Sequence, residues 1–343
     1  MGYEAEREVA VEAVQRAARL CVAVRSEMVA GLALQKADRS PVTVADFGSQ
    51  ALICRELARA FPEDPVVAEE DASALRDPAN AALLEQVAGY VRRIAPDDPV
   101  SVCDSVDLGN GHVCGRYWTL DPIDGTKGFL RDDQYAVALA LIVDGVVQVG
   151  ALACPACTLR ESEGEAGPGA LFVAVRGSGA FEMHMDGTGT RPLEVCVEDP
   201  DGLRFVESVE AAHGNHALQE SIAKSTGISR PSLRMDSQTK YAAVARGAAA
   251  LYLRLPSAKY PGYREKIWDH AAGSIVVEEA GGKVSDMFGS PLDFGADAVM
   301  YMNRGAVVSN RDIHEAVISQ LAVHPDAQWM RADTDGAEGA EGR

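Results

Sequence analysis

The sequence predicts an α/β protein in two parts, an α+β half up to about residue 200 and an α/β half beyond it. The first half combines long segments with helical spacing of apolar residues and apolar runs short enough to be strands. After about residue 200, short apolar runs alternate with helical patterns, which is typical of a sheet covered by helices on both sides. This change divides the chain into a domain at residues 1–200, a second domain at 201–330 and a disordered tail at 331–343.

Local signals predict the elements of the first half. Asp46 opens the second helix and Pro62 ends it, because proline cannot continue a helix. Asp144-Gly145 between two apolar runs is a strong hairpin signal. The expected helices cover residues 4–29, 46–61 and 80–93. The expected strands cover residues 66–68, 117–120, 135–143, 146–152 and 171–175, with a further extended segment at 40–44.

Alternating patterns predict the elements of the second half. One helix ends before Gly281-Gly282, because glycine readily adopts the backbone conformation that terminates helices. The expected strands cover residues 203–207, 232–235, 249–255, 283–285 and 305–309. The expected helices cover residues 216–226, 238–246, 268–280 and 313–321.

Composition restricts the partners of the protein. A formal net charge of −19 argues against a nucleic-acid polymer, whose binding needs a basic face, but it allows a small anionic ligand held by divalent cations. The longest purely apolar run, residues 135–143, is far shorter than the roughly 20 residues of a membrane-spanning helix. The N-terminus is acidic and lacks the pattern of a signal peptide. We therefore expect a cytoplasmic monomer that does not bind membranes.

The seven cysteines are expected to be free thiols, as in most cytosolic proteins. Cys154 and Cys157 have the spacing of a redox or zinc motif, but no second motif of this kind is present and the pair follows a strand instead of opening a helix. Buried or loop thiols are the favoured interpretation. The sequence leaves open a regulatory oxidation of this pair or of Cys103 with Cys114.

The most informative motif is Asp-Pro-Ile-Asp-Gly-Thr, which begins where the strand at 117–120 ends. A turn is expected to bring Asp124 back towards Asp121, so that two carboxylates and the Ile123 carbonyl converge as oxygen ligands for Mg²⁺. Thr126 opens a helix whose free N–H groups suit a phosphate. The competing interpretation is an Asx-turn that only caps this helix.

Other charged residues fit the same site. Glu69 follows a short strand and Asp269 begins a helix; taken singly, a solvated loop and a favourable helix-dipole position would explain them. Arg254 interrupts an apolar strand and Lys240 lies at a helix start. Because a buried charge needs a partner, we interpret these two as ligands of an anionic group rather than as ordinary surface charges.

Together these motifs resemble the inositol monophosphatase-like superfamily, in particular its 3′(2′),5′-bisphosphate nucleotidase branch of plant and fungal type. The superfamily pattern is an acidic pair after a strand, Asp-Pro-Ile-Asp-Gly-Thr, and Trp-Asp before a helix that ends at glycine. The segments similar to the branch are residues 40–46, 125–131, 236–241, 252–256 and 263–270. Ala68 and Ala212 replace glycines of the family pattern without removing a ligand.

The resemblance implies a five-layered αβαβα sandwich of the inositol monophosphatase/fructose-1,6-bisphosphatase type, with its site where the halves meet. Asp46 and Thr126 would orient and deprotonate the attacking water, and the amides of Gly125 and Thr126 would hold the transferring phosphoryl group. About two or three Mg²⁺ ions would be held by Glu69, Asp121, the Ile123 carbonyl, Asp124 and Asp269. The substrate would be contacted by His213, Ser237, Lys240, Arg254 and Asp269.

The implied activity is a lithium-sensitive phosphatase of sulfur metabolism. It would hydrolyse the 3′-phosphate of 3′-phosphoadenosine 5′-phosphate (PAP), and of its sulfated form PAPS, to give AMP and phosphate in the first case. Two alternatives stay open within the superfamily: an inositol polyphosphate 1-phosphatase and a broad-specificity inositol-type phosphatase. Outside enzymes, the alternative is a metabolite-binding protein of the same fold.

Overall fold

The computed structural model describes residues 2–27, 34–35, 41–42, 44–96, 101–158, 168–196, 203–209, 216–257 and 259–332. His213, one of the predicted substrate contacts, lies outside these residues. So does the predicted tail, except for its first two residues, which end helix α11 (Trp329–Ala332).

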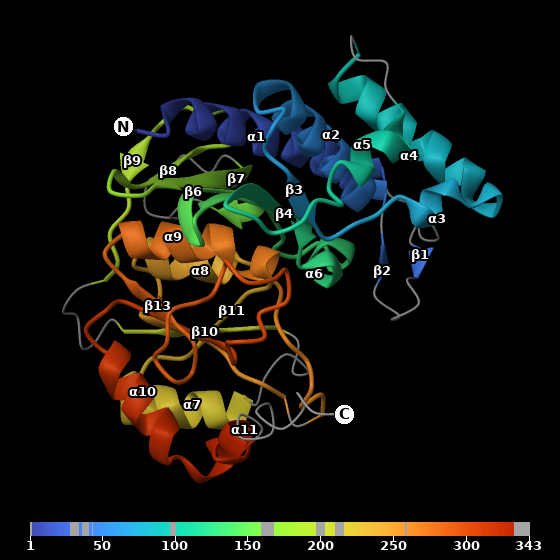
Figure 1. Cartoon of the computed structure of the whole chain (residues 1–343). Coiled ribbons are helices and arrows are strands. Elements are labelled where there is room, and N and C mark those ends of the chain that lie inside the picture. The colour runs from blue at the N-terminus through green and yellow to red at the C-terminus, as the bar shows by residue number, and fades with distance from the viewer. Residues whose placement is uncertain are drawn as a thin grey trace.

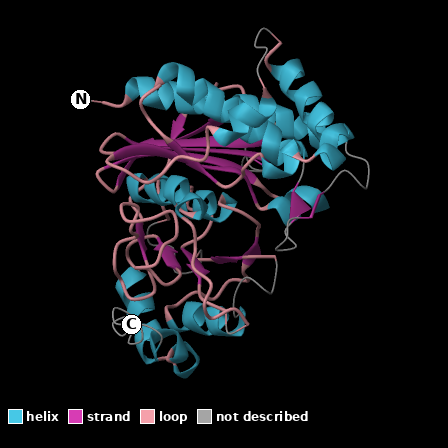
Figure 2. Ribbon diagram, turned by 45° about the vertical axis from the view of Figure 1, so that its right-hand side comes forward, coloured by secondary structure: helices cyan, strands magenta, loops and turns pink. Residues whose placement is uncertain are grey.

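Five layers of helix and sheet alternate through the molecule, as Figure 1 shows. Helices α1 and α2 cover the outer face of a seven-stranded sheet, and α8 and α9 lie between this sheet and a five-stranded one. Helices α7, α10 and α11 cover the far side of the second sheet, and Figure 2 shows the same order from another direction. The predicted αβαβα sandwich is confirmed.

The first sheet has the strand order β3-β4-β5-β6-β7-β8-β9 and is antiparallel except for the parallel pair β3 and β4. The predicted hairpin at Asp144-Gly145 is confirmed, and both residues have positive φ angles, of 50° and 74°. The strands are β3 (Val66–Ala68), β4 (Arg116–Asp124), β5 (Ala136–Val143), β6 (Val146–Thr158), β7 (Pro168–Val175), β8 (Gly179–His184) and β9 (Arg191–Pro192).

Strand β5 shows why the sequences of the central strands are apolar without interruption. Val137, Leu139 and Leu141 belong to the core under α1 and α2, whereas Ala138 and Ala140 belong to the core shared with the second sheet. Both faces of the sheet are therefore buried, so that neither set of alternating residues has to be polar. The smaller alanines are on the face that α9 covers.

The helices of the first half are α1 (Glu4–Glu27), α2 (Val44–Ala60), α3 (Ser73–Arg76), α4 (Ala81–Ile94), α5 (Val102–Asp107) and α6 (Thr126–Arg131), with the 3₁₀ turn η1 (Pro78–Asn80). The expected extended segment at 40–44 is correct for β2 (Pro41–Val42), which pairs with β1 (Leu34–Gln35), but wrong for Val44, where α2 already begins. The short helices α3 and α5 were not predicted, because so few residues show no helical period. No described helix is both long enough and apolar enough to cross a membrane.

The second sheet has the order β11-β10-β12-β14-β13, with β10 parallel to β11 and β12, and β14 antiparallel to its neighbours. Its strands are β10 (Phe205–Glu207), β11 (Leu233–Arg234), β12 (Leu251–Arg254), β13 (Lys283–Ser285) and β14 (Ala306–Ser309). The helices are α7 (His216–Ser225), α8 (Thr239–Ala245), α9 (Ala271–Glu279) and α10 (His314–Val323), with 3₁₀ turns η4 (Ile267–Asp269) and η5 (Pro325–Ala327). Because α8 and α9 share a core with the first sheet, the domain boundary near residue 200 stays a prediction.

A buried histidine joins α10 to the second sheet. His314 has no exposed surface, and its ring nitrogens lie 2.9 Å from the Ser285 hydroxyl and 2.8 Å from the Ser309 hydroxyl. Ser285 donates its own hydrogen to the Asp286 carbonyl, so it accepts from Nε2–H of a neutral His314. Burial, with a smaller contribution from Lys283, lowers the pKa of His314 to about 4.

Because the pKa of buried His314 is lowered, we expect the protein to lose stability in mild acid. Between pH 6.5 and about 4 the unfolded chain binds a proton that the folded chain rejects, so the free energy of unfolding falls as the pH is lowered through this window. The contribution is on the order of 3 kcal/mol. We expect the free energy of unfolding, measured with urea, to fall more between pH 7 and pH 4.5 for the wild type than for His314→Gln. An equal loss would contradict the assignment, and His324→Gln at a partly exposed position is the control.

Candidate active site

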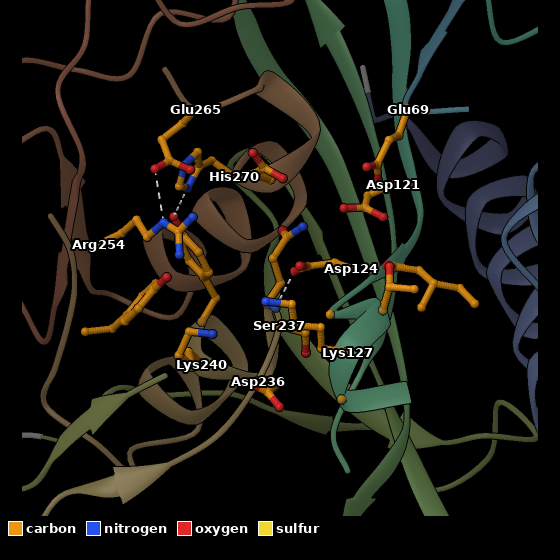
Figure 3. A pocket seen from close by; sticks show the side chains of 18 of the residues that line it. Glu69, Asp121, Asp124, Lys127, Asp236, Ser237, Lys240, Arg254, Glu265 and His270 are labelled. Atoms are coloured by element: carbon orange, nitrogen blue, oxygen red, sulfur yellow. Dashed lines mark hydrogen bonds and ion pairs between the residues drawn. The ribbon is translucent and has the colours of Figure 1, made fainter. Parts of the chain in front are cut away.

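A cavity of about 280 Å³ lies where the two halves of the chain meet. Figure 3 shows carboxylates from the first half on one side, including Glu69, Asp121 and Asp124, and the side chains of Lys240 and Arg254 on the other. Of the predicted site residues, the cavity is lined by Glu69, Asp121, Ile123, Asp124, Gly125, Thr126, Ser237, Lys240, Arg254 and Asp269. The structure thus brings these ten residues together from five separate segments of the chain.

Strand β4 carries the first two carboxylates. Residues three apart on a regular strand point to opposite faces, but β4 has one extra residue between Asp121, which pairs with Ala138, and Asp124, which pairs with Ala136. This bulge replaces the turn that the sequence predicted, and it directs both carboxylates to the cavity. Ser49 of α2 donates to the Pro122 carbonyl at 3.0 Å and supports the bulge from behind.

The environment of the Asp121 carboxylate suits a cation. It is 2% exposed, and its Oδ1 atom is buried without a hydrogen-bond donor. Burial raises the pKa of Asp121 well above its usual range, and the neighbouring carboxylates act in the same direction. Those neighbours are Glu69, Asp124, Asp269 and Asp46. A buried carboxylate oxygen without a donor, among further carboxylates, is the donor set that a hard divalent cation requires.

The side chains line one cavity without being drawn tightly together. Within the residues that the structure describes, no three Asp, Glu, His or Cys side chains already meet at metal-binding distances. The donor set nevertheless fits Mg²⁺ by its chemistry, because it consists of oxygen atoms that line one cavity. The assignment of individual ligands stays a proposal.

Glu69 and Glu70 have different environments although they are adjacent. The Gln50 side chain donates to the Glu70 carbonyl at 2.5 Å and accepts from the Glu70 N–H at 3.1 Å, which fixes the backbone after β3. Glu70 is 5% exposed, whereas Glu69 is exposed and lines the cavity. The predicted choice of Glu69 as the ligand agrees with this arrangement.

Asp269 lies at the end of the turn η4, directly before α9. The predicted helix at 268–280 is interrupted, because His270 has a non-helical φ of −133°. The Asp269 carboxylate accepts the Lys266 N–H at 3.0 Å, which holds it beside the cavity. Burial, together with Glu265, raises the pKa of Asp269 to about 7.

The groups predicted to handle the attacking water lie on two helices. Thr126 begins α6 and lines the cavity, and its hydroxyl donates to the Ile123 carbonyl at 3.2 Å. Asp46 lies in the first turn of α2 at 2% exposure. It does not line the described cavity, although its charge contributes to the raised pKa of Asp121.

Two glycines of the motif allow the second half to approach α6. Gly125 has a φ of 87°, and a Cβ there would lie 2.9 Å from the Cβ of Ser237. A Cβ on Gly128 would lie 2.2 Å from the Gln134 carbonyl oxygen and 3.0 Å from Asp236 Oδ2. A side chain at Gly125 would therefore push the segment before α8 away from the site, and one at Gly128 would clash first with the backbone of Gln134 and then with Asp236.

The cationic side of the cavity is built around Tyr252. Lys240 is 5% exposed, and its ammonium lies 5.2 Å from the centre of the Tyr252 ring. Burial lowers the pKa of Lys240 to about 8. Arg254 donates from Nε to Glu265 at 3.0 Å, and this carboxylate keeps the pKa of Arg254 above its usual value against the effect of burial.

Several lining residues had no role in the sequence analysis. Glu265 accepts from Arg254 and lies 3.6 Å from His270 Nε2, while Tyr241 lies 2.6 Å from His270 Nδ1. Burial alone would raise the pKa of Glu265, but Arg254 and His270 lower it to about 2. His270 itself lines the cavity beside these groups. The other lining residues without a predicted role are Lys127, Gly128, Asp236, Gln238, Tyr252 and Tyr263.

Residues 3–325 match the inositol monophosphatase family. The chain belongs to this family. It is 41% identical to the 3′(2′),5′-bisphosphate nucleotidase of Schizosaccharomyces pombe over 94% of this chain and 96% of that one. It is 43% identical to the protein of the same name from Oryza sativa, over 93% of this chain and 94% of that one.

Solved members of the inositol monophosphatase family share the fold. The Thermotoga maritima IMPase has a TM-score of 0.62 at 21% identity, covering 91% of this chain and 94% of that one. The extragenic suppressor protein SuhB of Bartonella henselae has a TM-score of 0.63 at 20% identity, with coverage of 92% and 98%. Metal dependence, typically on Mg²⁺, is characteristic of the family.

The two candidate cysteine pairs both consist of free thiols. Cys154 and Cys157 are buried free thiols within β6, which confirms the favoured interpretation. Burial raises the pKa of both thiols, so little of the reactive thiolate forms. Cys103 and Cys114 are also free thiols, and their regulatory oxidation stays a prediction.

Proposed function

We propose that this protein is a Mg²⁺-dependent 3′(2′),5′-bisphosphate nucleotidase that hydrolyses the 3′-phosphate of PAP, and of PAPS, with release of phosphate. The observation that supports it is the opposition of charges within one cavity. Carboxylates suited to cations lie on one side, and the buried Lys240 and the partly buried Arg254 lie on the other. The names of the curated relatives point to the same activity.

The proposal gives each side of the cavity one phosphate. The 3′-phosphate would lie beside the carboxylates and the amides of Gly125 and Thr126. Cations held by these carboxylates would neutralise the phosphate oxygens and lower the pKa of a bound water. Thr126, whose hydroxyl donates to the Ile123 carbonyl, would accept a hydrogen bond from this water and orient it, and the carboxylate of Asp46 would receive its proton. The uncleaved 5′-phosphate contacts Lys240 and Arg254, and Ser237 between the two sides contacts the sugar. His213 completes the proposed substrate contacts.

Binding at the distant phosphate serves the reaction by orientation. A substrate held at both ends has little freedom at the reacting phosphorus, which lowers the entropic part of the barrier. The cation–π contact with Tyr252 and the ion pair with Glu265 keep Lys240 and Arg254 in place before substrate arrives. Preorganised charges of this kind bind with less loss of side-chain entropy.

The working form in this proposal is a cytoplasmic monomer with about two or three Mg²⁺ ions in the site. Lithium is expected to inhibit it, because the small cation occupies a magnesium position without supplying the same charge. The resemblance to the nucleotidase branch motivates this part of the proposal.

A substrate panel tests the function directly. We expect Mg²⁺-dependent phosphate release to be fastest with PAP and PAPS, slower with adenosine 3′-monophosphate, and lost with EDTA. A preference for inositol 1,4-bisphosphate would favour an inositol polyphosphate 1-phosphatase. Rates on monophosphates equal to those on PAP would favour a broad-specificity phosphatase. Binding of PAP without turnover on any substrate would indicate a metabolite-binding protein.

A further inference from the structure

Gln238 lies where the carboxylate side of the cavity meets the second half of the chain. Its backbone N–H donates to Asp124 Oδ2 at 2.5 Å. Its side chain extends in the other direction, donating from Nε2 to the Trp268 carbonyl at 2.9 Å and accepting at Oε1 from the Gly273 N–H at 2.9 Å. One residue therefore contacts β4, the turn η4 and helix α9.

The contact with Gly273 replaces a missing helix cap. The first N–H groups of a helix have no partner within the helix. His270, the residue before α9, makes no side-chain cap, and Gly273 lies in the first turn. The Gln238 amide oxygen supplies the acceptor from a different part of the chain.

The contact with Trp268 acts on the next residue. The Trp268 carbonyl belongs to the planar peptide that leads into Asp269, so a bond to this oxygen restricts the orientation of that peptide. Gln238 is 1% exposed, which protects both side-chain bonds from competition by water. The residue thus fixes Asp124 of the first half and the peptide before Asp269 of the second half at the same time.

We propose that Gln238 is a positioning residue that fixes Asp124 and Asp269 relative to each other across the junction of the two halves and thereby strengthens Mg²⁺ binding. The inference rests on the metal site of the proposed function. It does not require that PAP is the substrate. Residues that orient metal ligands in this way typically contribute a factor of about 10 to 100 to metal affinity.

The test is a calorimetric Mg²⁺ titration of the full-length protein after treatment with EDTA. Gln238→Met keeps the size of the side chain but removes both of its hydrogen bonds. Gln238→Asn keeps the amide but is too short to reach both partners. We expect both variants to raise the Kd for Mg²⁺ by about 10 to 100-fold. For turnover of PAP, kcat should fall and partly recover at high Mg²⁺, while the KM for PAP changes little.

Gln219 offers a matched control in the second half. It is 2% exposed and donates to the Leu253 carbonyl at 3.1 Å, so Gln219→Met also removes a buried amide. We expect this variant to lose thermal stability without a change in Mg²⁺ affinity. A folded Gln238 variant with wild-type Mg²⁺ affinity, or an equal loss in Gln219→Met, would overturn the inference.

The titration also separates this inference from the proposed function. A wild type that binds Mg²⁺ but does not hydrolyse PAP would contradict the proposed substrate, while weakened binding in the Gln238 variants would still support the positioning role. A wild type that binds no Mg²⁺ would overturn the positioning role together with the metal site.

Discussion

Replacing Asp269 by asparagine is expected to lower kcat with Mg²⁺ by on the order of a thousandfold while the protein stays folded. Asp269 is the one predicted metal ligand from the second half, and the amide has the same shape but lacks the charge. The Lys266 N–H can still donate to the remaining oxygen, so the turn η4 should persist. Initial rates of phosphate release from PAP, together with circular dichroism, measure both parts of the prediction.

A second buried aspartate provides the control. Asp286 is 1% exposed and accepts from the N–H groups of Phe288 and Ser290, at 2.9 Å in each case, outside the cavity. Asp286→Asn should reduce the melting temperature and leave kcat close to that of the wild type. Near-normal turnover in folded Asp269→Asn would reject the ligand assignment.

Much of the site could be predicted because its residues lie at the ends of strongly patterned elements. Strand β4 and the hairpin after it are marked by apolar runs and by Asp144-Gly145, so the position of Asp121 towards the carboxyl-terminal end of β4 follows from the sequence. The bulge that turns Asp124 to the same face does not follow, because the extra residue is defined only by pairing with β5. A local pattern predicts a strand and leaves its register open.

The network on the cationic side shows a second limit of local patterns. The charge of Arg254 within an apolar strand indicated that a partner had to exist, yet Glu265 was not identified as that partner. The pairing depends on how the segment before η4 folds back against β12. The break at His270 also could not be predicted, because the sequence has no helix-breaking residue there.

Replacing Lys240 or Arg254 by alanine is expected to raise the KM for PAP by about 10 to 100-fold, since a charge-assisted hydrogen bond contributes roughly 1.5–3 kcal/mol. Both side chains lie on the cationic side of the cavity, opposite the carboxylates of the first half. The KM for adenosine 3′-monophosphate, which lacks the second phosphate, should change little. Steady-state kinetics of the two substrates, for each variant, give the comparison.

Arg254→Ala removes the ion-pair partner of Glu265. Glu265 is held ionised by Arg254 and His270, and without the arginine its charge would itself repel a phosphate. Arg254→Ala should therefore also be made with Glu265→Gln, and the rise in KM should persist in the double variant. Lys224→Ala is the matched control, because this lysine is exposed and paired with Glu220 on α7. A KM for PAP that is indifferent to both cavity variants would show that the second phosphate binds elsewhere, and would favour an inositol-type phosphatase that recognises only the phosphate it removes.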